Sequence, residues 1–153
     1  MWAMKIVRAR PRDAARLSEI ALASKSYWKY PAHWLEQWQL LLTVTPEDIR
    51  THETYAAVED GAQVGFYLLA GEPPVMTLEH LWVVPERIGL GIGRKLLLHA
   101  VAQAGSLGAL ALDIEADPHA EGFYLHMGAH RRGERTYTLD GQARSLPLLR
   151  IRL

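Results

Sequence analysis

A glycine-rich turn between an apolar strand and an amphipathic helix constrains the fold of this chain more than any other feature. The strand is expected over residues 77–84 and ends at Pro85. The turn reads Gly89-Leu90-Gly91-Ile92-Gly93, and residues 94–104 then repeat apolar side chains at helical spacing. Glycine lets the backbone of such a turn approach a ligand closely, and the start of a helix carries partial positive charge. Together these segments predict an anion site suited to a pyrophosphate.

Two other phosphate-binding motifs do not fit this turn. The dinucleotide pattern Gly-x-Gly-x-x-Gly requires a glycine at position 94, where Arg94 stands. The triphosphate loop requires Gly-Lys-Ser or Gly-Lys-Thr, whereas the chain reads Gly93-Arg94-Lys95-Leu96. A flexible turn with no ligand is the remaining alternative. The strand before the turn and the helix after it favour the anion site.

The remaining segments predict an α/β fold of the α+β kind, with helices on both faces of a mixed sheet. Strands are expected over 5–9, 54–58, 64–70, 77–84, 107–114, 129–135 and 146–151. Helices are expected over 14–24, from about Pro31, over 94–104 and over 118–127, with a short capped turn at residues 45–48. Asp60-Gly61 and Asp140-Gly141 predict tight turns.

Composition narrows the class of protein further. The 153 residues are 49% hydrophobic and show no linker or repeat, so we expect one domain over residues 1–153 that needs no metal. The absence of cysteine excludes disulfides, thiolate metal sites and an acyl-cysteine intermediate. Basic and acidic residues number 17 each, whereas nucleic-acid binders usually carry a basic excess, so we expect no nucleic-acid partner. The chain has neither a run of roughly 20 apolar residues nor a signal-peptide core at its start, so we expect a cytoplasmic protein without a membrane partner.

Two segments and their spacing resemble the GNAT superfamily of N-acetyltransferases over nearly the whole chain. The first is the strand with Leu81, Trp82 and Val83, followed by the glycine turn and Arg94. The second is Asp117-Pro118-His119-Ala120-Glu121-Gly122-Phe123-Tyr124, with Met127-Gly128-Ala129 after it. The resemblance implies a GNAT-like fold, in which about four helices flank a mostly antiparallel central sheet of about six to seven strands.

The resemblance also implies acetyl-CoA as cosubstrate. Strand residues Leu81, Trp82 and Val83 would pair by backbone with the pantetheine arm, where two neighbouring strands splay apart. The pyrophosphate would be held by Gly89, Leu90, Gly91, Ile92, Gly93 and Arg94. Asp117 and Tyr124 would contact the cofactor too, although Asp117 stands where the family often has Asn and is also suited to cap the helix at Pro118. The family usually places Gln or Arg just before the first glycine, where this chain has Ile88 after Arg87.

The implied reaction is N-acetylation of a primary amine, and without cysteine the simplest route is direct attack by the amine. The family implies Val83 N–H as donor to the thioester oxygen and Tyr124 as hydrogen-bond donor to the leaving thiolate. The alternative for Tyr124 is a core aromatic beside Phe123.

Glu79 is the candidate general base, because it lies four residues before Val83 and on the same strand face. The alternative for Glu79 is a solvated or structural carboxylate, and Asp113 and Glu115 are other candidates. His80 is expected on the opposite face in a structural role.

The acceptor would be a small-molecule or peptide amine, bound near the first two helices. Tyr27, Trp28 and Tyr30 are candidate substrate-binding residues, because ring faces attract ammonium groups. Core packing or a dimer surface is the alternative, and Trp34 and Trp38 are expected in the core at helical spacing. A homodimer is compatible with the resemblance. The alternative functions are a non-catalytic acyl-CoA-binding regulatory module and an unrelated nucleotide-binding protein.

Overall fold

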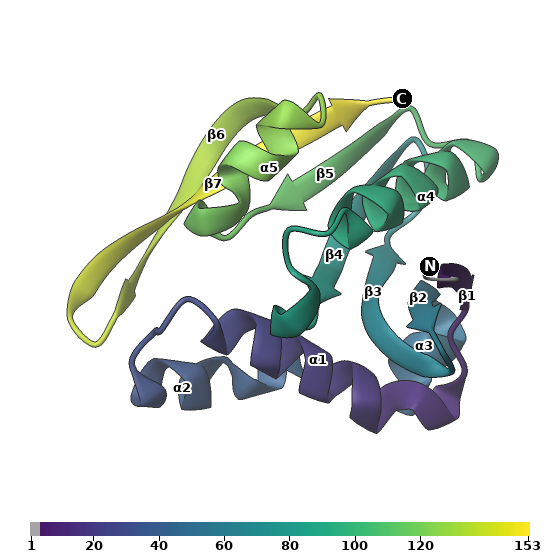
Figure 1. Ribbon diagram of the computed structural model, residues 1–153. Coiled ribbons are helices and arrows are strands. Elements are labelled where there is room, and N and C mark those ends of the chain that lie inside the picture. The colour runs from purple at the N-terminus through teal and green to yellow at the C-terminus, as the bar shows by residue number, and fades with distance from the viewer. Residues whose placement is uncertain (1–3) are drawn as a thin grey trace.

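One seven-stranded sheet runs through residues 4–153, the part of the chain that the computed structural model describes (Figure 1). Its strand order is β1-β2-β3-β4-β5-β7-β6, and β4 and β5 are the one parallel pair in this sheet. The strands are β1 (Met4–Arg8), β2 (Glu53–Glu59), β3 (Ala62–Ala70), β4 (Val75–Val83), β5 (Ala111–Glu115), β6 (His130–Leu139) and β7 (Gln142–Arg152). The predicted mixed, mostly antiparallel sheet is therefore confirmed.

Five α-helices lie within the described residues, where about four were expected. They are α1 (Ala14–Ser26), α2 (Ala32–Leu42), α3 (Pro46–Thr51), α4 (Ile92–Ser106) and α5 (Glu121–His126). The additional helix is α3, which the sequence predicted as a capped turn: Thr45 Oγ1 accepts from Asp48 N, and Asp48 Oδ2 accepts from Thr45 N. None of the helices in residues 4–153 combines the length and apolarity that a bilayer crossing requires.

Helices α1 and α4 both pack on the central strands β3 and β4 (Figure 1). Residues 64–69 of β3 are buried without alternation, so both faces of this strand are covered. Helix α1 buries Leu17, Ile20 and Ala21, and α4 buries residues at i, i+4 and i+8 such as Leu96, Ala100 and Ala104. The apolar residues that recur at helical spacing in the sequence are thus the ones that α1 and α4 bury against the sheet.

The strand predicted over 107–114 begins later than expected, at Ala111. Helix α4 continues to Ser106, and its last carbonyls accept hydrogen bonds from the backbone N–H groups of Leu107 and Ala109. Gly108 then adopts φ +97°, which ends the helix. Leu107 and Leu110 remain exposed, so the apolar run that suggested a longer strand belongs to a helix cap.

The last two strands are longer than predicted and form a hairpin beyond the rest of the sheet. Asp140 and Gly141 have φ of +50° and +75°, so the predicted turn is confirmed. In Figure 1 this hairpin (yellow-green and yellow) extends past β5 toward α2. Gln37 of α2 donates to Asp140 Oδ1 at 3.0 Å, and His33 Nε2 lies 2.7 Å from Oδ2 of the same carboxylate. The hairpin tip is thereby fastened to α2.

Candidate functional site

The parallel pairing of β4 with β5 stops halfway along β4. The last paired residues are Leu78 and Ile114, whereas β4 stays paired with β3 as far as Val83, past a register shift at Glu79 (Figure 1). The predicted splay is therefore confirmed, and it leaves one edge of residues 79–83 without a neighbouring strand. We call this edge the β4 notch.

Main-chain alternation shows which amides face the β4 notch. Val84 N donates to Val64 O on β3 at 2.9 Å. In an extended strand successive N–H groups point to opposite edges, so the N–H of Val83 points away from β3. Leu81 N–H points the same way, while Trp82 N–H faces β3. Two donors at this open edge thus come from candidate cofactor-binding residues.

The glycine turn follows β4 after a 3-10 turn at Pro85–Arg87 and leads into α4. Gly89 and Gly91 have φ of +84° and +87°, and a Cβ added to either would meet no protein atom within 4 Å. The glycines are therefore required by backbone conformation and not by packing inside the protein. No side chain of residues 4–153 caps the start of α4, so the N–H groups of Ile92, Gly93 and Arg94 stay available to an anion.

The residues just before the turn depart from the family pattern. Ile88 is 37% exposed, and Arg87 donates from Nε to Oε1 of buried Glu59 at 2.8 Å. Arg87 thus ties the turn to β2. Arg94, in the first turn of α4, places Nη1 3.7 Å from Met127 Sδ, which leaves its charge at the exposed start of the helix.

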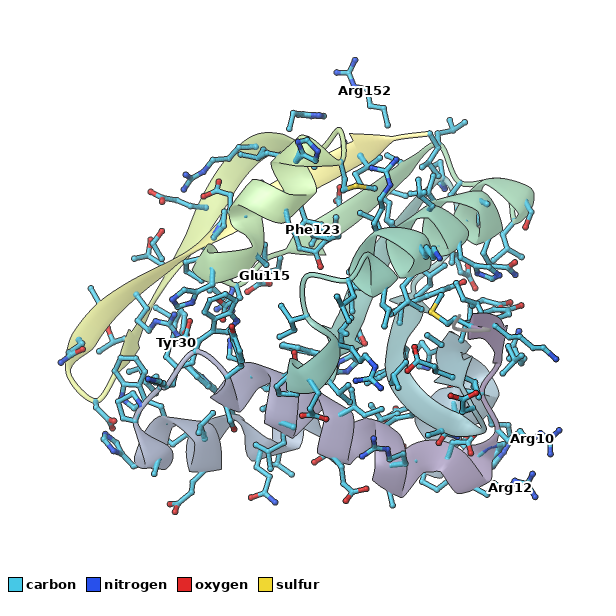
Figure 2. All side chains as sticks on the ribbon, in the orientation of Figure 1. Arg10, Arg12, Tyr30, Glu115, Phe123 and Arg152 are labelled. Atoms are coloured by element: carbon cyan, nitrogen blue, oxygen red, sulfur yellow. The ribbon has the colours of Figure 1, made fainter. Side chains whose placement is uncertain are left out.

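A cavity of about 620 Å³ opens beside the β4 notch. Its walls come from β4, the end of β5, helices α1 and α2, and the β6–β7 hairpin. Among the described residues, its lining includes Lys25, Gln37, Trp38, Leu41, Leu42, Thr77, Leu78, Glu79, His80, Trp82, Glu115, Ala116, Asp117, Arg135, Tyr137, Leu139 and Leu146. Figure 2 shows Glu115 at the end of β5 and Tyr30 in the α1–α2 connection, on the same side of β4.

The carboxylates of this cavity differ in how they are neutralised. Glu115 forms an ion pair with Arg135, and Asp117 with Lys25. Asp113 lies on β5, two residues before Glu115, and does not line the cavity. It receives two hydrogen bonds from Arg150, which hold its pKa below the usual range. Glu79 is exposed and has no hydrogen bond or ion pair to any described residue. Of the candidate bases, Glu79 is thus the one whose lone pairs are free.

Asp117 is the centre of a nearly buried polar network. Its carboxylate pairs with Lys25 and accepts from Tyr30 Oη at 2.9 Å and from the backbone N–H of His119 at 2.8 Å. Burial would raise the pKa of Asp117, but Lys25 and these hydrogen bonds hold it below its usual value. Burial lowers the pKa of Lys25, which the attraction of Asp117 offsets only in part. The predicted cap is confirmed, since the His119 N–H bond caps the 3-10 turn at Pro118–Ala120.

Glu79 and His80 both line the cavity, although strand alternation predicted that they face opposite sides. A β-bulge explains this outcome: Leu68 pairs with His80 and Leu69 with Leu78, so Glu79 is an extra residue on β4 and the alternation of faces is broken there. Trp82 Nε1 donates to His80 Nδ1 at 3.0 Å, and burial lowers the pKa of His80 to about 4. His80 is therefore neutral at physiological pH.

Tyr124 lies on α5, which packs against the start of α4 through Phe123 and Gly93 (Figure 2). Tyr124 is only 7% exposed, and burial, followed by the charge of Asp117, raises the pKa of its phenol. Its hydroxyl bonds no described residue. Among the described residues, Glu59 Oε2 is the one fully buried side-chain nitrogen or oxygen that lacks a hydrogen-bond partner, so the Tyr124 hydroxyl is not fully buried. The Tyr124 hydroxyl therefore keeps some solvent contact and has no protein partner among the described residues.

The three predicted substrate-binding residues lie beside the cavity without lining it. Trp28 stacks on the His119 ring at 4.5 Å, and Tyr27 meets Trp28 edge-on at 4.9 Å. The hydroxyl of Tyr30 is held by Asp117 and His119. Trp38, expected in the core, is buried and also forms part of the cavity wall.

Sequence reasoning did not identify the cations of this region, or the hairpin side of the cavity, as parts of the site. The Arg144 guanidinium lies 5.1 Å from the ring centroids of Tyr30 and Trp38. Arg135, Tyr137 and Leu139 all line the cavity from β6. Their spacing of two was the available signal, because it places all three on one strand face.

Solved structures share this fold at low sequence identity. A GCN5-related N-acetyltransferase from Rhodopseudomonas palustris is 24% identical with a TM-score of 0.77, over 100% of this chain and 96% of the other. The PaiA N-acetyltransferase from Thermoplasma acidophilum, solved with coenzyme A, is 20% identical with a TM-score of 0.79, over 99% of each chain. The ribosomal-protein-S18-alanine N-acetyltransferase from Escherichia coli is 17% identical with a TM-score of 0.74, over 98% and 94%.

Sequence comparison identifies the family. No curated protein sequence matches this chain. The model of the acetyltransferase (GNAT) family matches residues 16–129, which span α1 to the residue before β6 and include the β4 notch, the glycine turn and Tyr124. On that match, and with the fold expected for it, the chain belongs to the GNAT family of acetyltransferases.

Proposed function

We propose that this protein transfers the acetyl group of acetyl-CoA to a primary amine of a small molecule or a protein, by direct attack of the amine. One juxtaposition carries the proposal. The β4 notch, with the N–H groups of Leu81 and Val83 at its open edge, lies between the glycine turn and a cavity that holds a free carboxylate. A ligand with a diphosphate, an extended amide arm and a reactive end fits that sequence of sites.

The residues present suit coenzyme A. The open space at Gly89 and Gly91 and the uncapped start of α4 provide a main-chain cradle for the diphosphate. Leu81, Trp82 and Val83 would hold the pantetheine arm as an added strand does. Asp117 would contribute less through its carboxylate, which Lys25, Tyr30 and His119 already occupy. A coenzyme A complex of the PaiA relative supports the same ligand here.

Three groups of this chain would carry the transfer. Bound acetyl-CoA supplies an activated acyl carbon and a thiolate leaving group. Glu79 accepts a proton from the bound ammonium, directly or through a water, so that the neutral amine can attack the acyl carbon. As the amide forms its nitrogen loses a second proton, and the thiolate takes a proton at or after release. The Val83 N–H donates to the thioester oxygen as negative charge develops there. The Tyr124 hydroxyl donates a hydrogen bond to the departing sulfur, and its raised pKa makes it a donor that keeps its own proton.

The experiment is thiol release from acetyl-CoA against chemically diverse amines, combined with calorimetry of coenzyme A, ATP and NAD. We expect coenzyme A to bind in preference to the other two nucleotides, with steady thiol release for at least one amine and an acetylated product by mass spectrometry. Tight binding of coenzyme A with no turnover across the panel would instead support an acyl-CoA-binding regulatory module. Preference for ATP or NAD would refute both readings.

A further inference from the structure

We infer that the acceptor is a monoamine with an apolar body, and that a second ammonium group on the acceptor is rejected. The inference rests on the proposed function, because it concerns the acceptor of that same site. It follows from how charges and rings are distributed around the cavity between the β4 notch, α2 and the β6–β7 hairpin.

Cationic side chains of the protein already lie against the aromatic rings around this cavity. Lys25 Nζ lies 4.5 Å from the Trp38 ring centroid, and the Arg144 guanidinium lies 5.1 Å from the same ring. The Arg135 guanidinium lies 5.1 Å from the ring centroid of Tyr137. A ring face that holds one cation offers little attraction to another, so Trp38 and Tyr137 do not form an open ammonium cage.

On the side of the cavity away from β4, no lining carboxylate is free to pair with a second ammonium. Lys25 and Arg135 are balanced by Asp117 and Glu115, respectively. Arg144 donates to the hydroxyls of Tyr137 and Tyr30 and forms no ion pair with a described carboxylate. An acceptor ammonium pointing toward α2 would therefore find no free carboxylate partner in the cavity lining.

The β4 side has the opposite character. Glu79 carries a charge that no described residue balances, and its neighbour His80 is neutral at physiological pH. One ammonium is therefore attracted to β4, which is also where the amine must meet the acyl group. The cavity orients the acceptor with its amine toward Glu79 and its other end toward α2 and the hairpin.

The wall that meets that other end is mainly apolar. Leu41 and Leu42 of α2, together with Leu139 and Leu146 of the hairpin, line it beside Trp38. Burying a charge against such a wall without a partner is costly, whereas burying methylene or aryl groups is favourable. An alkyl or aryl body therefore fits where a second ammonium does not.

A matched set of acceptors tests this inference, because its members differ only at the far end. Hexylamine, 1,6-diaminohexane and 6-aminohexanoate each carry a primary amine on a six-carbon chain, and their other ends are a methyl, an ammonium and a carboxylate group. Phenethylamine carries an aryl body instead. We expect kcat/KM for hexylamine and phenethylamine to exceed that for 1,6-diaminohexane by about tenfold or more. A higher value for the diamine, or for 6-aminohexanoate, would overturn the inference.

Leu41 and Leu40 offer a matched pair of variants on one helix. Leu41 lines the cavity and is 73% exposed, whereas Leu40 is 88% exposed and is not part of the wall. Both positions accept a glutamate without burying it, so folding is not at risk. We expect Leu41→Glu to raise kcat/KM for 1,6-diaminohexane relative to hexylamine by about tenfold, and Leu40→Glu to leave the ratio unchanged.

The outcomes separate this inference from the proposed function. Failure of every amine, with coenzyme A bound or not, counts against N-acetylation itself. Turnover of amines with the diamine preferred, or an equal change of the ratio in both leucine variants, leaves N-acetylation in place and refutes the monoamine assignment.

Discussion

The indole of Trp82 donates a hydrogen bond of 3.0 Å to Nδ1 of His80, two residues before it on β4. Indole nitrogen is only a donor, so Nδ1 must be the acceptor and the imidazole proton lies on Nε2. Protonation of Nδ1 would break this bond and place a charge in a buried position. The pair therefore links the shape of the cavity wall to pH.

We expect His80 to make the fold less stable in mild acid. Its pKa is about 4 in the folded state against 6.5 for the free side chain, so between these values the unfolded state binds more protons. The free energy of unfolding should thus fall as the pH falls, by about 2 kcal/mol from this group between pH 7 and pH 5. Urea unfolding of wild type and His80→Gln at both pH values measures the effect.

The His80→Gln variant should lose less stability between pH 7 and pH 5 than wild type does. Because carboxylates also contribute to acid sensitivity, the relevant quantity is the difference between the two proteins. The exposed His126→Gln serves as a control for replacing a histidine. Identical pH dependence in wild type and His80→Gln would show that His80 is not the titrating group.

Tyr124→Phe should lower turnover without loosening the cofactor. The variant keeps the buried ring and removes a hydroxyl that bonds no described residue, so the fold should be unaffected. We expect kcat to drop by about tenfold or more and the dissociation constant of acetyl-CoA to stay within about twofold. Tyr67→Phe is the control, because it removes a hydroxyl that bonds His99 outside the cavity. Turnover equal to wild type would exclude Tyr124 from the reaction.

Gly91→Val should weaken coenzyme A binding through the backbone and the space beside it. Gly91 has φ +87°, where an L side chain is strained, and its Cβ would occupy open space at the start of α4. Gly61, with φ +81° and equally open space, lies in the β2–β3 turn and is a matched control. Both variants should lose similar stability on heating, whereas only Gly91→Val should raise the dissociation constant by about tenfold or more. Equal affinity in the two variants would argue against the diphosphate site.

Glu79→Gln should slow the reaction more than Glu115→Gln does. The first removes the free carboxylate of the cavity, and the second removes one that is paired with Arg135. General base catalysis is typically worth about a hundredfold or more, so we expect at least that loss of kcat/KM for the amine in Glu79→Gln. Coenzyme A affinity should not change. A larger loss in Glu115→Gln would move the base to the end of β5.

Lys25 and Asp117 should prove coupled in a double-mutant cycle. Lys25→Met leaves a nearly buried carboxylate without its cation, which should lower the free energy of unfolding by about 3 kcal/mol. Adding Asp117→Asn removes the orphaned charge and should restore part of that loss. Denaturant unfolding of the two single variants and the double variant gives the coupling. Additive losses would mean that the pair contributes little.

The fold and the main-chain part of the site followed from local sequence patterns. The strand over residues 77–84, the glycine turn and the helix after it are contiguous, and the Asp-Gly turns depend on two residues each. Their physical causes act within a few residues, so periodicity and turn chemistry predicted them. The boundary errors, as at Leu107 and Leu110, arose where a helix cap and a strand both accept apolar residues.

The side-chain part of the site could not be predicted in the same way. Lys25 meets Asp117 from 92 positions away, and Arg144 meets Tyr30 from 114 positions away. These pairs exist because the β6–β7 hairpin and the α1–α2 connection are brought to the same cavity, and no local pattern encodes that meeting. The substrate-binding role of Tyr27, Trp28 and Tyr30 stays a prediction, and rings of this aromatic segment contact His119, Asp117 and Arg144, which local sequence could not indicate.

The β4 notch has a consequence for the thermodynamics of the chain. The two halves of the sheet, β1–β4 and β5–β7, are joined edge to edge by only four residue pairs, from Val75–Ala111 to Leu78–Ile114. A ligand that pairs with the open amides of β4 beyond Leu78 would add hydrogen bonds at the point where the two halves separate. Because such a ligand binds the native chain and not the denatured one, its concentration shifts the unfolding equilibrium toward the native state. Part of the protein's thermal stability would therefore come from a bound small metabolite in addition to the contacts between its own residues.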